Sequence, residues 1–201
     1  MPKHELHIAV ANAINKILNT LVCGKPEFEI KKDEAADDSN GPKQHLSFFL
    51  PGDPKRESGV SKVDIIIVKK GVVKLACEIE ESGFNPTKIF GKVFSTAAAN
   101  TCRLYKLKEH THYKLDKVGV FVEVLSSDKM LARTKNQKNT KKFIQGDLIQ
   151  TEINGLLSNS SSWLQHYHLL FGEKADFDSG GKCYLKLEEI IKKLQTDSST
   201  L

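Results

Sequence analysis

Two apolar runs joined by a glycine-containing turn constrain the fold more than any other part of the chain. The first, VDIIIV, covers residues 63–68 and is rich in β-branched side chains, and the second, VVKLACEIEE, covers residues 72–81. Two such runs separated by a few residues with Gly predict an antiparallel β-hairpin. Because side chains alternate along a strand, Glu78 and Glu80 should share one face, opposite a face that packs on a core.

The acidic residues of this hairpin suggest a metal site. Thirteen residues separate Asp64 from Glu78, a spacing that lets the hairpin bring Asp64 beside Glu78 and Glu80. Three carboxylates in a partly desolvated place repel one another, and Mg²⁺, which prefers oxygen ligands, removes that repulsion. The alternative is that the two Glu residues only form the solvated face of a sheet. However, a charge at Asp64, inside an apolar run, is costly unless it has a partner.

A helix is predicted directly after the hairpin. Asn85 supplies an N-cap, Pro86 suits the first helical position, and a periodic segment continues to about residue 108. A helix N-terminus and lysines near an acidic cluster suit a site that handles phosphate. The inner side of this helix is predicted to carry Ile89, Val93, Ala97 and Leu104.

At these residues the sequence resembles the PD-(D/E)xK nuclease superfamily, the fold of most type II restriction endonucleases. The signature of that superfamily is an Asp early in one strand, (D/E)-x-K on the next strand, and then a helix. Asp64 matches the first position and Glu78 the second, whereas Glu80 stands where the Lys usually lies, as in the E-x-E form of the BamHI-like restriction enzymes. The resemblance covers roughly 40 of the 201 residues.

The resemblance implies a Mg²⁺-dependent endonuclease, with Mn²⁺ as an alternative metal, in which Asp64 and Glu78 hold the ion. Either Glu80 acts as a general base or metal ligand, or a lysine of the following helix, Lys88 or Lys92, reaches back into the site. We assign catalytic roles to Asp64, Glu78, Glu80 and Lys88.

The N-terminal segment, HELHIAVANAINKILNTLV, predicts an amphipathic helix that ends near Gly24. Glu5 is its only carboxylate and a further candidate metal ligand, because an acidic residue on the first helix often joins the metal site in the superfamily it resembles. The alternative for Glu5 is a first-turn residue favoured by the helix dipole. His4 and His7 lie one turn apart, but without a third ligand in view we expect them to bind no metal.

The remaining elements complete a mixed sheet. We expect strands at 28–30, 45–50 and 118–125. In the last of these, Phe121 and Glu123 face one way and the valines face the other, namely Val118, Val120, Val122 and Val124. A helix between two strands predicts a crossover that places the strand at 118–125 beside the hairpin. The segment 55–62 is interpreted either as basic residues that approach the proposed site or as a solvated loop, and the segment 108–117 as a polar link.

Residues 147–172 are predicted to form two helical pieces around a Ser-rich joint, with Trp163, Tyr167 and Leu170 on a packing face. A final helix, or a strand followed by a helix, is expected at 183–195. The prediction is one α/β domain over residues 1–201 with a restriction-endonuclease-like core, a central mixed β-sheet flanked by helices. That core would occupy about 1–125, and 126–201 would be a DNA-contacting and helical extension.

Charge is consistent with a nucleic-acid partner. The chain has 30 Lys and Arg against 25 Asp and Glu, a net charge of +5 and a pI of about 8.9. In the basic stretch 128–142, side chains that would neutralise DNA phosphates are Lys129, Arg133, Lys135, Lys138 and Lys141. A solvated loop is the alternative. The expected partner is double-stranded DNA, bound by a homodimer, because restriction enzymes that cut palindromes are usually symmetric dimers.

Other classes fit the sequence less well. No 18-residue apolar run or signal peptide is present, so we expect neither membrane insertion nor secretion, and four dispersed cysteines suggest reduced thiols in a cytoplasmic protein. A Gly-rich nucleotide loop and a G-x-S-x-G motif are absent. A type II restriction endonuclease is therefore the expectation. The alternatives are a repair or junction-resolving nuclease of the same fold and a non-catalytic DNA- or protein-binding module.

Overall fold

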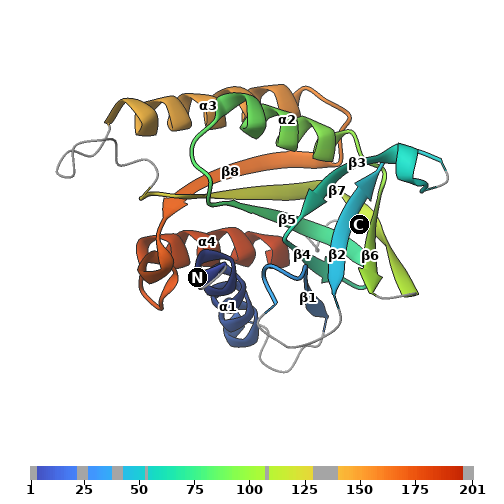
Figure 1. The fold of residues 1–201 in the computed structure, drawn as a ribbon, viewed down its shortest axis with the longest axis horizontal. Helices are drawn as coiled ribbons and strands as arrows, with labels where there is room; N and C mark the ends of the chain where they lie inside the picture. The colour runs from blue at the N-terminus through green and yellow to red at the C-terminus, as the bar shows by residue number, and fades with distance from the viewer. Residues whose placement is uncertain are drawn as a thin grey trace.

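A computed structural model describes residues 4–21, 27–37, 43–52, 54–106, 109–128 and 140–196. Within these ranges the chain forms a mixed open sheet of eight strands with helices on both faces (Figure 1). The strand order is β1-β4-β5-β7-β6-β2-β3, and β8 also pairs with β7. The predicted α/β class with a central mixed sheet is therefore confirmed.

The elements in chain order are α1 (Glu5–Leu21), β1 (Phe28–Lys32), β2 (Gln44–Phe49), η1 (Arg56–Ser58), β3 (Gly59–Val63), β4 (Ile65–Lys69), β5 (Val72–Glu80), α2 (Pro86–Ala97), β6 (Thr101–Lys106), β7 (Glu109–Ser126), α3 (Thr140–Ser158), β8 (Leu164–Gly172), η2 (Lys174–Phe177) and α4 (Lys182–Thr196).

The predicted hairpin is present as β4 and β5, which pair antiparallel with Ile66 opposite Ala76. β7 runs parallel to β5, and β8 runs parallel to β7. Parallel neighbours require crossover connections, and here α2 and α3 belong to those connections. Both lie on the same face of the sheet, whereas α1 and α4 cover the other face (Figure 1). The predicted crossover between the hairpin and the strand at 118–125 is confirmed.

Two apolar cores follow from this arrangement, one on each face of the sheet. Under α1 and α4 the sheet contributes Leu75, Cys77 and Ile79, all buried as predicted. Under α2 and α3 the core contains Phe48, Phe121 and Tyr167. Full burial of one such apolar side chain contributes about 1.5–3 kcal/mol. Along β5, therefore, Glu78 and Glu80 face the side of α2.

The helix after the hairpin is shorter than predicted. It ends at Ala97, and Leu104 lies on β6 instead of on the inner face of a helix. The backbone turns at Ala98 to Asn100, where the Asn100 amide donates a hydrogen bond to the Phe49 carbonyl at 2.8 Å. The ladder between β2 and β6 begins there, with Phe49 opposite Thr101. The local pattern of residues 101–106 favours a helix, but pairing with β2 makes this segment a strand.

Three further predictions of local structure are wrong. Residues 59–63 form strand β3 on the edge of the sheet, and the expected polar link 108–117 is largely the first half of β7, paired with β6. The second helical piece around Tyr167 is strand β8. Trp163, Tyr167 and Leu170 have helical spacing, but pairing of β8 with the apolar strand β7 determines the conformation.

Candidate active site

β5 and β7 place three glutamates on the face of the sheet that α2 covers. Glu78 and Glu80 alternate with core residues of β5, and Glu123 is the register partner of Glu78 on the parallel strand β7. Glu123 is only 3% exposed, and its Oε2 accepts a hydrogen bond of 2.9 Å from the Tyr167 hydroxyl. The sequence prediction missed Glu123 as a site residue. Its one signal was an acidic residue in an otherwise apolar run.

Asp64 lies at the bend where β3 ends and β4 begins, instead of inside one continuous strand. Its amide donates to the Cys77 carbonyl at 3.1 Å, and its carbonyl accepts from the Asp33 amide at 2.7 Å. Its Oδ2 accepts a hydrogen bond of 2.6 Å from the amide of Ile79, the residue after Glu78. The carboxylate is therefore held against the end of β5, where the predicted acidic pair begins.

A cavity of about 380 Å³ opens beside the three glutamates of β5 and β7. Glu78, Glu80 and Glu123 form one wall, and β3 forms another through Val60, Ser61 and Lys62. α2 closes the cavity with two lysines and two small residues, Lys88, Lys92, Gly91 and Ser95. We call this the acidic cavity.

Both lysines that α2 turns toward the acidic cavity pair with its glutamates. Lys92 Nζ lies 2.5 Å from Glu78 Oε1 and also donates to the Lys62 carbonyl at 2.8 Å. Lys88 Nζ lies 3.6 Å from Glu80 Oε2. Positions 88 and 92 are one turn apart and share a face of the helix. The Asn85 side chain, which accepts from the Lys88 amide at 3.2 Å, fixes where this helix begins.

Burial strongly affects the protonation of the acids. Burial, with the nearby charge of Glu78, raises the pKa of Asp64 to about 8. Burial also raises the pKa of Glu78 to about 7, although Lys92 acts in the opposite direction. The pKa of Glu123 is raised to about 7 by burial and by the charge of Glu78. For Glu80, burial raises the pKa, but hydrogen bonds with Ser82 and the charge of Lys88 outweigh it and lower the pKa below its usual value.

Glu5, the other candidate metal ligand, is directed elsewhere. Its Oε2 lies 3.6 Å from Lys174 Nζ, and it lines a separate cavity with residues of α1 and η2. α1 reaches the site through His7 instead, whose Nε2 lies 3.7 Å from Asp64 Oδ2. The sequence prediction did not connect His7 with the acids, because the contact depends on how α1 packs across the sheet.

Among the described residues, one set of three or more His, Cys, Asp and Glu side chains has ligand atoms close enough to share a metal ion. The set is His4, His7 and Glu81, with ligand atoms within 4.8 Å of one another. Glu81 Oε1 lies 3.2 Å from His7 Nδ1. Imidazole nitrogens suit zinc and other transition metals, whereas the oxygen donors of Asp64 and Glu78 suit Mg²⁺. These histidines were expected to bind no metal, and the third ligand comes from the residue after β5.

The predicted DNA-contacting side chains fall mostly outside the described ranges. Lys129, Arg133, Lys135 and Lys138 belong to residues 129–139, which the structure does not describe, and Lys141 is exposed on the first turn of α3. Of the four cysteines, Cys77, Cys102 and Cys183 are buried free thiols. In the described part of the chain, no helix is both long and apolar enough to span a membrane.

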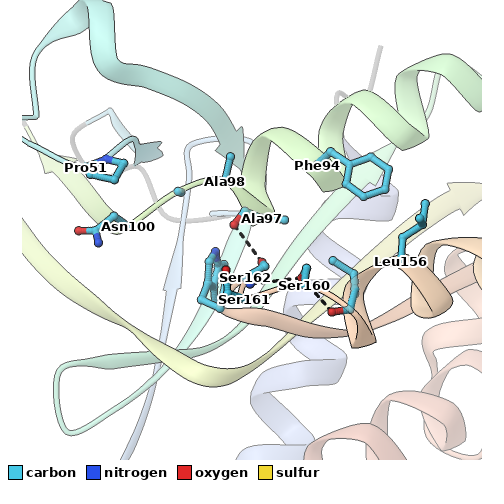
Figure 2. A pocket seen from close by; sticks show the side chains of 12 residues that line it. Pro51, Phe94, Ala97, Ala98, Asn100, Leu156, Ser160, Ser161 and Ser162 are labelled. Atoms are coloured by element: carbon cyan, nitrogen blue, oxygen red, sulfur yellow. Dashed lines mark hydrogen bonds between the residues drawn. The ribbon is translucent and has the colours of Figure 1, made fainter.

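A further cavity of about 430 Å³ lies between the C-terminal ends of α2 and α3 (Figure 2). Its lining contains no ionisable side chain, and Figure 2 shows Ser160 and Ser162 engaged by hydrogen bonds with backbone carbonyls. Trp163 Nε1 likewise donates to the Thr96 carbonyl at 2.8 Å. Because nucleophilic catalysis by serine needs a neighbouring base, the chemistry is better placed in the acidic cavity.

Comparison of the chain with models of known protein families, with curated proteins and with solved structures gave no significant match in any of the three. The assignment of function therefore depends on the geometry and chemistry of the site.

Proposed function

We propose that the protein is a metal-dependent deoxyribonuclease that hydrolyses phosphodiester bonds of double-stranded DNA. The observation that carries the proposal is a pair of buried carboxylates from neighbouring strands. Asp64 is held against the Ile79 amide at the end of β5, close enough for the charge of Glu78 to raise its pKa, and Glu78 lines the acidic cavity beside Lys92. Buried acids with raised pKa values in a cleft are typical of catalytic and metal sites.

The donor set fits a hard divalent cation. Asp64 and Glu78 offer carboxylate oxygens, which Mg²⁺ prefers, and positive charge near them would lower their raised pKa values. A Mg²⁺ ion held by these two residues would polarise the scissile phosphate and lower the pKa of a bound water.

The other residues of the acidic cavity have separate roles in the proposed reaction. Lys92 offsets the negative charge that builds up on the phosphorus oxygens in the transition state, and Lys88 does so from the mouth of the cavity. Glu80, whose lowered pKa keeps it ionised at neutral pH, orients the attacking water through a hydrogen bond. Glu123 adds a third carboxylate to the cavity wall beside Glu78, and a hydrogen bond from the Tyr167 hydroxyl holds that carboxylate in place.

The direct test is cleavage of plasmid DNA by purified protein with Mg²⁺. Asp64→Asn and Glu78→Gln should each abolish cleavage while DNA binding is preserved. Glu189→Gln is the matched control, because Glu189 is an exposed carboxylate of α4 that pairs with Lys186 and Lys193 of its own helix. Full activity of the Asp64→Asn/Glu78→Gln double variant would rule out this site.

The class of nuclease is tested by sequencing the ends of the products. Fragments with one recurrent terminal sequence would identify a type II restriction endonuclease, whereas cuts at flaps, mismatches or junctions would identify a repair or junction-resolving enzyme. Binding of DNA without cleavage under any divalent metal would leave only a binding module. The homodimer and the cytoplasmic location remain predictions.

A further inference from the structure

The outer face of strands β2, β6 and β7 carries a row of aromatic and imidazole rings that belong to neither apolar core. The pairing of these strands puts His45 opposite Tyr105 and Tyr105 opposite His110. The rings of His45 and Tyr105 are stacked, with centroids 4.7 Å apart and planes 13° apart, and the His110 ring lies 6.0 Å from that of Tyr105. We call these three residues the ring platform.

The ring platform is accessible because the other face of the same strands packs on the core. Leu46, Phe48 and Cys102 alternate with the platform residues and are completely buried. In contrast, His45 and His110 are exposed and Tyr105 is half-buried. The stacked pair of His45 and Tyr105 therefore lies at the surface of the sheet.

A cavity of about 500 Å³ lies against the ring platform. One side is formed by His45, Phe49 and Tyr105, and the other by the β3 residues Val60, Ser61 and Lys62. These three β3 residues also line the acidic cavity, so β3 is a wall common to both cavities. α2 holds this wall in place, because the Thr96 hydroxyl bonds to Ser61 Oγ at 2.8 Å and Lys92 bonds to the Lys62 carbonyl.

Cationic groups accompany the rings. Lys62 is exposed, and its register partner on β2 is Ser47, whose neighbour on β6 is Arg103. Arg103 is fixed in place by hydrogen bonds to the Pro54 carbonyl at 3.0 Å and to His112 Nδ1 at 3.2 Å. Aromatic faces beside basic side chains are the combination that binds single-stranded nucleic acid, because the bases stack and the backbone is neutralised.

We propose that this cavity binds an unpaired nucleotide of the DNA substrate, with its base extending the stacked pair of His45 and Tyr105 and its phosphate beside Lys62. The proposal rests on the nuclease function proposed above and adds a substrate class: DNA in which a duplex adjoins unpaired bases. In a continuous duplex the base faces are occupied by neighbouring bases and cannot reach the platform. The shared wall of β3 places the bound nucleotide next to the acidic cavity.

The test compares binding of three probes in EDTA, where no cleavage occurs: an oligo(dT) strand, a strand of the same length with abasic sugars, and a blunt duplex. The wild-type protein should bind oligo(dT) roughly tenfold more tightly than the abasic strand, since stacking of a base on an aromatic ring is worth about 1–3 kcal/mol. Tyr105→Thr, which keeps a β-forming residue but removes the ring, should abolish this difference and leave duplex binding unchanged. Tyr105→Phe should preserve it.

Two controls separate this inference from the nuclease proposal. Phe94→Leu removes a partly exposed ring on α2, away from the platform, and should bind all three probes as the wild type does. Glu78→Gln should keep base-dependent binding while losing cleavage. Equal wild-type affinity for the oligo(dT) and abasic strands, or an unchanged preference in folded Tyr105→Thr, would overturn the ring platform as a binding site. Absence of cleavage by the wild-type protein in Mg²⁺, with its base-dependent binding intact, would instead overturn only the nuclease proposal.

Discussion

Glu80 stands where the nuclease signature that the sequence resembles usually has a lysine, and the cation beside Glu78 comes from a different element. Lys92 reaches Glu78 from α2, one turn after Lys88, which lies nearer the cavity mouth at Glu80. The sequence left open whether Lys88 or Lys92 would reach back into the site. In the structure both do, and Lys92 is the one that contacts the more buried carboxylate.

Lys92 should therefore matter more to the rate than Lys88. We predict that Lys92→Met lowers the single-turnover rate of DNA cleavage by roughly 100-fold or more, the effect typical of removing a group that stabilises transition-state charge. Lys88→Met should cost about tenfold or less, because its side chain is 60% exposed and its charge is screened by solvent. Single-turnover cleavage rates measure both, and a larger loss for Lys88→Met would reverse the assigned roles.

The raised pKa values of the buried acids predict how stability depends on pH. Asp64, with a pKa of about 8, and Glu78, with a pKa of about 7, bind protons more tightly in the folded than in the unfolded protein, where carboxyl pKa values lie near 4. Their contribution to stability is therefore complete below about pH 4 and is lost as the pH rises through 7 to 8.

Without divalent metal, the melting temperature of the wild type should fall more steeply between about pH 6 and pH 8 than that of Asp64→Asn/Glu78→Gln, which cannot titrate at these positions. Mg²⁺ should raise the wild-type melting temperature more at pH 8 than at pH 6, because a cation favours the ionised acids. Thermal scans in EDTA and in Mg²⁺ measure both effects. Parallel pH profiles for the two proteins would contradict the assigned pKa shifts.

Residues of the site were predictable where the chemistry lies on adjacent segments. Asp64 and Glu78 belong to one hairpin and Lys92 to the helix that follows it, so short-range patterns located all three. Glu123 and His7 are added by the parallel pairing of β7 and by the packing of α1, which depend on contacts between distant parts of the chain. No local pattern encodes such contacts.

At the level of elements, the same distinction separates what could be predicted from what could not. α1 and the β4–β5 hairpin have strong periodicity and were predicted correctly. The first half of β7 is polar on both faces and has no alternating pattern, and β8 has apolar residues at helical spacing. Both become strands because their neighbours in the sheet supply hydrogen-bond partners, which is a tertiary effect.

Close packing between the start of β8 and β7 makes a testable prediction for a glycine. A Cβ on Gly119 would lie 2.2 Å from Trp163 Cε3 and 2.9 Å from the Trp163 carbonyl oxygen, so the chain would have to shift. Gly119→Ala should therefore lower the free energy of unfolding by roughly 2–3 kcal/mol. The matched control is Gly155→Ala on α3, where a Cβ meets nothing within 4 Å. That change should be neutral or should add up to about 1 kcal/mol. Chemical denaturation measures both, and an unchanged stability for Gly119→Ala would contradict the packing.

For the molecule as a whole, one sheet joins two cores. The α1–α4 core includes Ile14 and Leu187, and the α2–α3 core includes Phe121 and Trp163. The strands β5 and β7 contribute side chains to both. We therefore expect the two cores to unfold together, in one transition.

Ile14→Ala tests this coupling, because Ile14 is completely buried on α1 and Trp163, the only tryptophan, lies in the opposite core. The substitution should cost roughly 2–5 kcal/mol and should shift the unfolding curves followed by Trp163 fluorescence and by far-ultraviolet circular dichroism to the same new midpoint. Separate midpoints for the two signals would mean that the cores unfold independently.

Calorimetric titration of the metal-free protein with Mn²⁺ and Mg²⁺ tests the central claim, that buried acids from neighbouring strands form a site for a divalent ion. The account predicts saturable binding to the wild type, loss of that binding in Asp64→Asn/Glu78→Gln, and its retention when His4 is replaced by Ala. Absence of saturable heat in the wild type, or uptake unchanged in the double variant, would contradict it.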